Sequence, residues 1–341
     1  MKITIEEREL HFKQPAGTSR GVYTERHIWL LRVSDGSAVG YGECAPLPQL
    51  SCDDIPNYGD VLRRHCDEVE RTGEIDYEAL RDFPSMLFGL ETAMLSLRSH
   101  PSPLLFDTAF SRGETGIPIN GLVWMGTFEE MQQRIEEKLS KGFRCVKLKI
   151  GAIDFDAELD LIKKIRRRFS HHDVELRVDA NGAFTFDEAL YKLELLSQYA
   201  LHSIEQPIKA GQWSFMSELC RESPLPIALD EELIGVNDLD QKRQMLNIIR
   251  PRYIILKPSL HGGMSGCREW IALAKDMGIG SWITSALESN VGLNAIAQFC
   301  SAVYGDVIMM PQGLGTGQLF TDNIPMPLEI RGDQLWISKN S

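Results

Sequence analysis

The sequence Gly142-Phe-Arg-Cys-Val-Lys-Leu-Lys-Ile-Gly151 places two lysines inside a short apolar run. Apolar residues alternate there with Lys147 and Lys149, which predicts a strand whose two faces differ. Amphipathic helical patterns flank the run, and a strand between helices is usually buried in a parallel sheet. Two ammonium groups at such a place are costly unless anionic groups face them. A solvated lysine face would explain this strand alone, but the segments that follow argue for a functional site.

From about residue 117 onward, short apolar runs alternate with amphipathic helical patterns, which is the order of parallel βα units. Thr127 with Glu130, and Thr185 with Glu188, form capping-box patterns that predict two of the helix starts. Eight parallel strands are the number that closes a βα barrel. The strand candidates are Ile117–Trp124, Val146–Ile150, Glu175–Ala180, His202–Gln206, Pro226–Glu231, Arg252–Lys257, Gly280–Ser285 and Asp306–Met310.

The first hundred residues follow a different pattern. Lys2–Phe12 and His27–Val33 alternate like antiparallel strands, and a turn at Asp35-Gly36 leads into Ala38–Cys44. The polar, glycine-bearing residues 13–21 predict a mobile loop, and residues 58–100 follow helical stripes. We therefore expect a small α+β domain. Residues 325–341 alternate again and are expected to pair back onto it.

Composition narrows the class of protein. A net charge of −12 over 341 residues argues against nucleic acid or an anionic membrane surface as the main partner. The seven scattered cysteines predict reduced thiols rather than a disulfide framework. The N-terminal sequence does not resemble a signal peptide, and no apolar run is long enough to cross a bilayer. These features favour a cytoplasmic location. The oligomeric state is left open.

Charged residues stand near the C-terminal ends of five successive predicted strands, with a spacing of about one βα unit: Lys147 and Lys149, then Asp179, Glu205, Asp230 and Lys257. In a βα barrel these ends converge on one mouth, where the active site lies. Three converging carboxylates repel one another, and Mg²⁺ or Mn²⁺ would relieve that repulsion through hard oxygen ligands. A lone Asp after a strand is more often a helix N-cap. Five such strand ends in succession instead predict a catalytic site.

Lys-x-Lys on one strand, followed in order by Val-Asp-Ala-Asn, Ile-Glu-Gln-Pro and Ala-Leu-Asp-Glu, resembles the enolase superfamily and, within it, the muconate-lactonizing subgroup. The resemblance spans essentially the whole chain. It implies an α/β fold, a modified TIM barrel (β/α)7β over residues 113–322, with an N-terminal α+β capping domain over residues 1–112. Residues 323–341 would return to the capping domain.

The same resemblance implies roles for the residues at the strand ends. Lys149 would be the general base and Lys147 its electrostatic neighbour, with Lys257 on the opposite face of the substrate. Glu231 follows a ligand and is not expected to coordinate directly. The implied Mg²⁺ ligands are Asp179, Glu205 and Asp230.

The implied chemistry is removal of a proton α to a carboxylate, which gives a metal-stabilised enediolate. An ordinary lysine is protonated at neutral pH and cannot act as a base. A neighbouring ammonium group and a divalent cation both favour the neutral form of a lysine. The paired lysines and the carboxylate cluster therefore suit this step.

Four further segments are similar to the o-succinylbenzoate synthases of menaquinone biosynthesis: Thr18–Gly21, Gly40–Pro48, Ser285–Leu293 and Gly313–Gly317. That similarity implies syn-dehydration of 2-succinyl-6-hydroxy-2,4-cyclohexadiene-1-carboxylate, a small dicarboxylate, to o-succinylbenzoate. Glycine permits close backbone approach, so the glycine-rich segment is a candidate to bind the succinyl carboxylate. The candidate substrate-binding residues are Ser285, Gly313, Gly315 and Arg20, the last on the expected loop.

Three alternatives remain open. Dipeptide epimerases of the same subgroup usually carry Asp-x-Asp after the last strand, whereas Met310–Leu319 contains no acidic residue. N-succinylamino acid racemisation needs the same metal and lysines, and is harder to exclude. A metal-free Schiff-base barrel that uses Lys257 would leave the three acidic strand ends unexplained.

Overall fold

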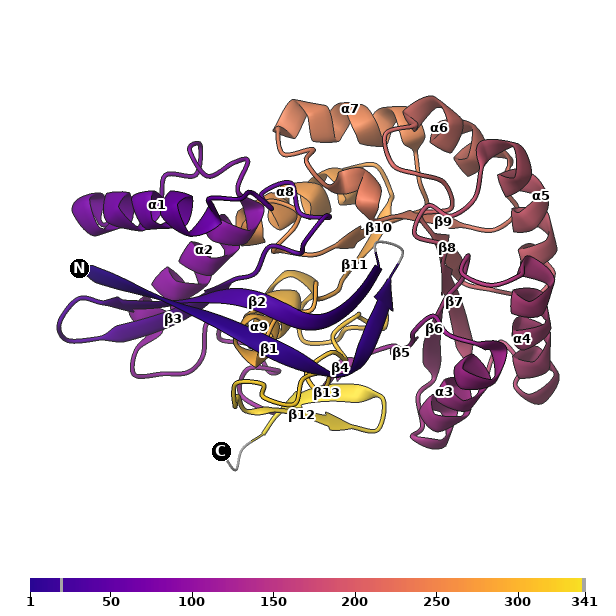
Figure 1. Ribbon diagram of the computed structural model, residues 1–341, viewed down its shortest axis with the longest axis horizontal. Coiled ribbons are helices and arrows are strands. Elements are labelled where there is room, and N and C mark those ends of the chain that lie inside the picture. The colour runs from indigo at the N-terminus through magenta and orange to yellow at the C-terminus, as the bar shows by residue number, and fades with distance from the viewer. Residues whose placement is uncertain (19–20, 339–341) are drawn as a thin grey trace.

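The computed structural model describes residues 1–18 and 21–338. The N-terminal unit is an antiparallel sheet of β1 (Lys2–Thr18), β2 (Gly21–Ser34) and β3 (Val39–Cys44), covered by α1 (Tyr58–Thr72) and α2 (Pro84–Ser99). Apolar side chains of α1 and α2 pack with those of the sheet into a core that belongs to this unit. Figure 1 shows the unit beside the larger barrel. An α+β unit thus precedes the barrel, as the sequence predicts.

The expected mobile loop over residues 13–21 is wrong for the part of it that the structure describes. Lys13–Thr18 continue β1, and the hairpin register ends with Thr18 opposite Gly21. The register shifts between His11 and Ala16, so the strand carries an irregularity there. Backbone pairing with β2 overrides the turn propensity of the glycines. Arg20 lies outside the described residues.

Seven parallel strands form the barrel sheet, in the order β11-β10-β9-β8-β7-β6-β5. Each neighbouring pair is parallel, and helices α3 to α7 form its outer rim in Figure 1. Thr127 caps α3 through the predicted capping box. The elements are β5 (Gly121–Val123), α3 (Phe128–Ser140), β6 (Cys145–Lys149), α4 (Phe155–Arg168), β7 (Glu175–Asp179), α5 (Phe186–Ser197), β8 (Ser203–Glu205), α6 (Trp213–Glu222), β9 (Ile227–Leu229), the 3₁₀ helix η1 (Glu231–Leu233), α7 (Leu239–Ile249), β10 (Tyr253–Leu256), α8 (Gly263–Asp276), β11 (Gly280–Ile283) and α9 (Asn290–Tyr304).

The expected strand at Asp306–Met310 is wrong, because these residues form no strand. Val307 and Met309 are largely exposed, so this apolar run does not enter the barrel. The two edges of the sheet are instead joined a few residues later, by single parallel bridges from Gln312 to Ile119 and from Gly313 to Thr284. The Gln312 side chain also accepts a hydrogen bond from the Ile283 backbone N–H at 2.7 Å. The buried Gln312 thus contacts both edges of the sheet, at the place where an eighth strand was expected.

The C-terminal hairpin of β12 (Leu328–Arg331) and β13 (Gln334–Ile337) pairs with β4 (Ile117–Pro118), just before the barrel. We expected this segment to join the sheet of the N-terminal unit, but it pairs with β4 instead. The segment before the hairpin contacts the sheet of the N-terminal unit, through a bridge between Phe320 and Phe12. The domain limits after residues 112 and 322 stay a prediction.

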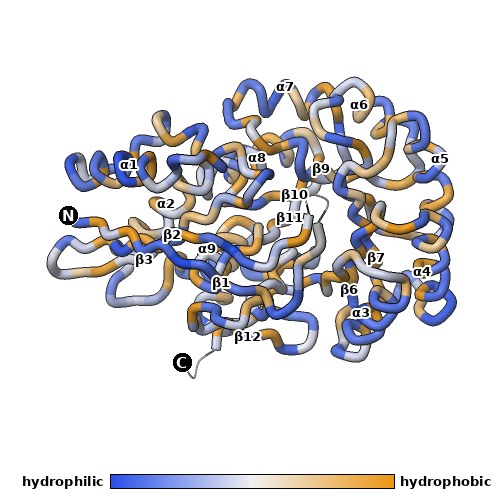
Figure 2. The backbone as a smooth tube through the Cα atoms, viewed as in Figure 1, coloured by the Kyte–Doolittle hydropathy of each residue, from blue (hydrophilic) through white to orange (hydrophobic). Residues whose placement is uncertain are grey.

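The barrel core is a continuous cluster of buried side chains from the strands and the inner faces of the helices. In Figure 2 the barrel strand β7 is strongly hydrophobic, whereas the outer helices α3 and α4 show long hydrophilic stretches. Within residues 1–18 and 21–338, none of the helices combines the length and apolarity that a membrane span requires.

Two buried carboxylates of the N-terminal unit cap helices of the barrel. Glu43 accepts hydrogen bonds from the backbone N–H groups of Ser289 and Gly292, both at 2.8 Å, at the start of α9. Glu91 on α2 accepts them from Met264 at 2.5 Å and Ser265 at 3.0 Å, in the first turn of α8. Acidic groups at helix N-termini satisfy unpaired N–H groups and favour the helix dipole. The two units are therefore joined by polar contacts at defined helix ends.

The contact at Glu91 predicts a pH-dependent contribution to stability. Burial raises the pKa of this carboxyl from 4.5 to about 7. Since the folded protein binds the proton more tightly than the unfolded chain, this contribution is complete below pH 4.5 and is lost as the pH rises through 7. Between pH 4.5 and 8 we expect wild type to lose on the order of 3 kcal/mol of unfolding free energy that Glu91→Gln does not lose. Urea unfolding at both pH values measures this difference.

Glu78→Gln is the matched control, because the Glu78 side chain is exposed on the same unit. It should keep the wild-type pH dependence. Identical pH profiles for wild type and Glu91→Gln would contradict the prediction.

Candidate active site

The strand register brings three of the predicted site residues into one row. Lys149 pairs with Asp179 across β6 and β7, and Asp179 pairs with Glu205 across β7 and β8. All three end their strands, so their side chains project at the C-terminal mouth of the barrel. Asp230 and Lys257 follow β9 and β10 directly. The strands β6 and β10 have three other strands between them, which places Lys149 and Lys257 on different sides of the mouth.

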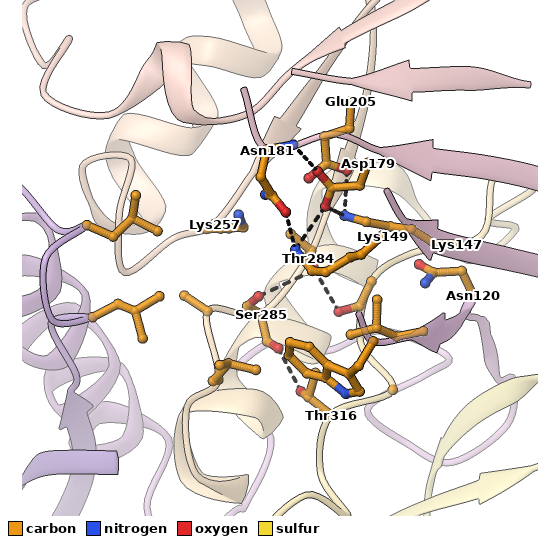
Figure 3. Close-up of a pocket in the computed structure, with 18 of the residues that line it drawn as sticks. Asn120, Lys147, Lys149, Asp179, Asn181, Glu205, Lys257, Thr284, Ser285 and Thr316 are labelled. Carbon is orange, nitrogen blue, oxygen red and sulfur yellow. Dashed lines mark hydrogen bonds and ion pairs between the residues drawn. The ribbon is translucent and has the colours of Figure 1, made fainter. Parts of the chain in front are cut away.

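A network of ion pairs joins Lys147 and Lys149 to Asp179 and Glu205 (Figure 3). Lys147 Nζ lies 2.9 Å from Asp179 Oδ2 and 2.5 Å from Glu205 Oε2. Lys149 Nζ donates to the same Asp179 oxygen at 3.1 Å and to Asn181 Oδ1 at 2.6 Å. The two lysines thus share one carboxylate, and each has a second oxygen partner.

On the other side of the mouth, Lys257 Nζ donates to Asp230 Oδ2. Burial lowers the pKa of Lys257, but the Asp230 and Glu205 carboxylates outweigh it and raise that pKa above its usual value. The same balance of burial against carboxylates raises the pKa of Lys147. Both lysines are therefore cations in this arrangement.

The pKa values of the Asp179 and Glu205 carboxyls shift in opposite directions. Burial raises the pKa of Asp179, but Lys147 and Lys149 outweigh it and hold that pKa well below its usual range. At Glu205, burial and the negative charge of Asp179 raise the pKa. The lysines therefore relieve only part of the repulsion within the carboxylate cluster.

Three buried carboxylate oxygens of the cluster have no hydrogen-bond partner within residues 1–18 and 21–338: Glu205 Oε1, Asp230 Oδ1 and Glu231 Oε2. Buried polar atoms are rarely left unpaired, and hard anionic oxygens are the ligands that Mg²⁺ prefers. No three His, Cys, Asp or Glu side chains in the described part of the chain form a ready-made metal cluster. Carboxylates reorient about their side-chain torsions, and a bound cation would draw these oxygens together. The donor set fits an oxygen-seeking cation, with Glu231 as an unexpected further candidate.

The lysines and carboxylates border a pocket that capping-unit and barrel residues enclose. Ser285, Gly313 and Gly315, the candidate substrate-binding residues, line it. The Ser285 and Thr316 hydroxyls lie 2.6 Å apart on its wall. A Cβ atom at Gly313 would come within 2.1 Å of Thr284 Oγ1, so glycine is required there by packing. The remaining lining residues are Tyr23, Leu47, Leu50, Asn120, Leu122, Trp124, Lys147, Lys149, Asp179, Asn181, Glu205, Glu231, Lys257, Trp282, Thr284, Ala286, Leu287 and Thr316.

Similarity to known proteins agrees with this geometry. The family described as "Enolase C-terminal domain-like" matches residues 130–339, and "MenC, N-terminal domain" matches residues 18–97. An o-succinylbenzoate synthase of Desulfotalea psychrophila is 47% identical over 99% of both chains. The chain belongs to the o-succinylbenzoate synthase family of the enolase superfamily. The crystal structure of MenC from D. psychrophila superimposes with a TM-score of 0.85 at 43% identity, over 99% of each chain.

Other members of the superfamily are more distant. The L-Ala-D/L-Glu epimerase of Bacillus subtilis is 25% identical over 83% of this chain and 79% of its own. An o-succinylbenzoate synthase structure from Thermosynechococcus elongatus, described as complexed with Mg in the active site, has a TM-score of 0.76 at 21% identity over 96% of each chain. That likeness shows the shared barrel and capping fold.

Sequence reasoning missed two residues that support the site, although both lie in the quoted motifs. Asn181 accepts from Lys149 and donates to Glu231 Oε1 at 2.8 Å. Gln206 accepts from the backbone N–H groups of Asp230 and Glu232, both at 3.2 Å, and so fixes the turn after β9. Asn181 has φ of 45° and Gln206 has φ of 38°, a backbone region that is uncommon outside glycine and often marks functional sites. An amide one or two residues after a strand-end acid was the available signal.

Proposed function

We propose that this protein catalyses the Mg²⁺-dependent syn-dehydration of 2-succinyl-6-hydroxy-2,4-cyclohexadiene-1-carboxylate to o-succinylbenzoate, in menaquinone biosynthesis. The observation that carries the proposal is the 47% identity, over 99% of both chains, to a protein named o-succinylbenzoate synthase. Residues at the barrel mouth support it, because two lysines and a set of buried carboxylates border one pocket. The residues by themselves would also suit other reactions that begin at a carbon next to a carboxylate.

In this proposal Asp179, Glu205 and Asp230 hold the cation, as the unpartnered oxygens of two of them suggest. A bound Mg²⁺ would supply positive charge next to the substrate carboxylate, where negative charge develops. A related synthase structure is described as containing Mg in its active site. Glu231 lies next to these residues and completes the acidic group.

Lys149 acts as the base. Its amine removes the proton from C1 of the ring, and the electron pair of the broken C–H bond moves toward the ring carboxylate. Asn181 Oδ1, at 2.6 Å, orients the amine. The C6–O bond then breaks, and the leaving hydroxide takes the same proton back from Lys149 to form water. One C–H bond and one C–O bond are broken, the ring becomes aromatic, and Lys149 ends neutral, as it began.

Lys147 and Lys257 stay protonated in this scheme. Lys147 lies beside the base and contributes positive charge to this side of the mouth. Lys257, on the far side of the mouth, faces the ring as a cation while negative charge spreads through its π-system. Backbone and hydroxyl groups near Ser285, Gly313 and Gly315 are proposed to bind the succinyl carboxylate, and Arg20 stays a prediction.

Turnover of the cyclohexadiene substrate, followed by the absorbance of the aromatic product, tests the proposal. We expect turnover with Mg²⁺, complete loss with EDTA, and recovery when Mg²⁺ is added back. Parallel samples in D₂O would contain N-succinylamino acids or dipeptides, to detect exchange of the α-proton. Exchange without dehydration would replace this proposal by racemisation or epimerisation.

A further inference from the structure

Arg26 on β2 joins the two walls of the pocket from inside the protein. Its side chain is 1% exposed, although arginine is rarely buried without a specific partner. It lies in the N-terminal unit, yet two of its hydrogen bonds reach the barrel. The proposed function assigns no role to it.

The guanidinium group binds backbone carbonyls on both sides. On the capping side, Nη1 donates to Pro46 O and Nη2 to Ala45 O, the latter at 2.5 Å. On the barrel side, Nε donates to Leu287 O at 3.1 Å and Nη2 to Ala286 O at 3.5 Å. A planar fork of fixed donors therefore sets the spacing between these two backbone segments.

Both segments are pocket walls. Leu47 and Leu50 line the pocket from the capping unit, one and four residues after Pro46, whose carbonyl Arg26 holds. Ser285, Ala286 and Leu287 line it from the barrel. A change in the spacing of the carbonyls would therefore change the shape of the pocket without moving the lysines or carboxylates on β6 to β10.

The barrel segment is also strained. Leu287 has φ of 64°, a left-handed conformation that non-glycine residues adopt only when their surroundings hold them there. Its carbonyl is the one that Arg26 Nε binds. Glu288 Oε2 accepts from the Ala286 backbone N–H at 2.7 Å and holds the same turn from the other side. Burial lowers the pKa of the Arg26 guanidinium, and the Glu288 and Glu43 carboxylates offset part of that effect.

We propose that Arg26 is a positioning residue, which fixes the capping segment 45–50 against the barrel segment 285–287 and thereby shapes the pocket for the substrate. This inference rests on the proposed function for the identity of the substrate. It predicts a defect in substrate binding, whereas the reacting groups stay in place.

Steady-state kinetics of two variants test the proposal. Arg26→Met removes every donor, and Arg26→Lys keeps the charge but loses the planar fork. We expect each variant to raise KM at least about tenfold while kcat changes less than about threefold. The Kd for Mg²⁺, measured by calorimetry, should be unchanged. A fall in kcat together with weaker Mg²⁺ binding, at unchanged KM, would overturn the proposal.

Arg166→Met is the matched control. Arg166 donates to the backbone carbonyls of Tyr199 at 2.8 Å, Val174 at 2.7 Å and Ala200 at 3.0 Å, close to the N-terminal ends of β7 and β8. It therefore joins segments as Arg26 does, but at the end of the barrel opposite to the pocket. We expect it to lower the thermal midpoint and leave KM within twofold of wild type. An equal rise in KM in Arg166→Met would overturn the positioning role.

Two further outcomes are informative. Failure of both Arg26 variants to fold would assign the residue to stability and overturn the proposal. Absence of turnover by wild type would overturn only the proposed function, and hydrogen exchange would then test the positioning role. Amides of residues 45–50 and 285–288 should lose protection in Arg26→Lys and keep it in Arg166→Met. Unchanged protection in both would contradict the inference.

Discussion

Replacing Lys149 by Ala is expected to reduce dehydration by about 10³-fold or more, since general base catalysis contributes about 10² to 10⁴ and no second amine occupies its place. Lys147 lies beside it, but it is held as a cation between Asp179 and Glu205 at 2.9 and 2.5 Å. Lys257 lies on the other side of the mouth, where it pairs with Asp230. Neither is free to take over the proton.

The fold should survive this change. Asp179 keeps its contact with Lys147, and Asn181 keeps its bond to Glu231. We therefore expect a thermal midpoint within a few degrees of wild type and normal Mg²⁺ binding. Both should be measured beside turnover and beside exchange of the substrate α-proton in D₂O.

Lys192→Ala is the control for Lys149→Ala. Lys192 is also partly buried and lies 3.0 Å from a carboxylate oxygen of Glu188, but on α5 and away from the pocket. It should keep nearly full turnover. Retained dehydration or retained α-proton exchange in Lys149→Ala would move the base to another residue.

The second large effect is expected from Glu205→Gln. One Glu205 oxygen accepts from Lys147, and the other is buried without a partner among the described residues. The amide keeps the shape but removes a negative charge and presents an N–H₂ group to the cation site. We expect Mg²⁺ affinity to fall at least about tenfold, or about 1.4 kcal/mol, and turnover to fall with it at limiting Mg²⁺. Calorimetric titration of the apoprotein measures the affinity directly.

Glu232→Gln provides the comparison. Glu232 is another buried carboxylate after β9, but it binds Gln206 Nε2 at 2.9 Å and the Gly211 backbone N–H at 2.7 Å instead of the lysines. This variant should bind Mg²⁺ as wild type does. Equal Mg²⁺ affinity in wild type and Glu205→Gln would remove Glu205 from the ligand set.

The barrel could be predicted because its signals are local. Alternation within Val146–Ile150, capping boxes such as Thr127 with Glu130, and a charged residue near each strand end all lie within one βα unit. Parallel strands place those ends at the same edge, so the order of the chain was enough to expect Lys149, Asp179 and Glu205 in one row.

The errors have a common physical cause, which is competition from partners distant in the sequence. The apolar run Asp306–Met310 reads as a strand, but the barrel is closed by Gln312 and Gly313 instead. Within residues 325–338, the hairpin of β12 and β13 forms as the alternation predicts, yet its partner is β4. Lys13–Thr18 carry loop residues but continue β1, and Ala16–Thr18 pair with β2. Pairing energy depends on the partner, and local composition does not identify it.

The sequence by itself determined the βα order, the lysine pair, the acidic strand ends and the capping unit, because each follows from local periodicity and residue type. Only the tertiary structure decided how Asn181 joins Lys149 to Glu231, and how Arg26 reaches Ala286 and Leu287, some 260 residues away. Buried polar groups bind whatever the fold brings within reach, and that choice depends on packing across the whole chain.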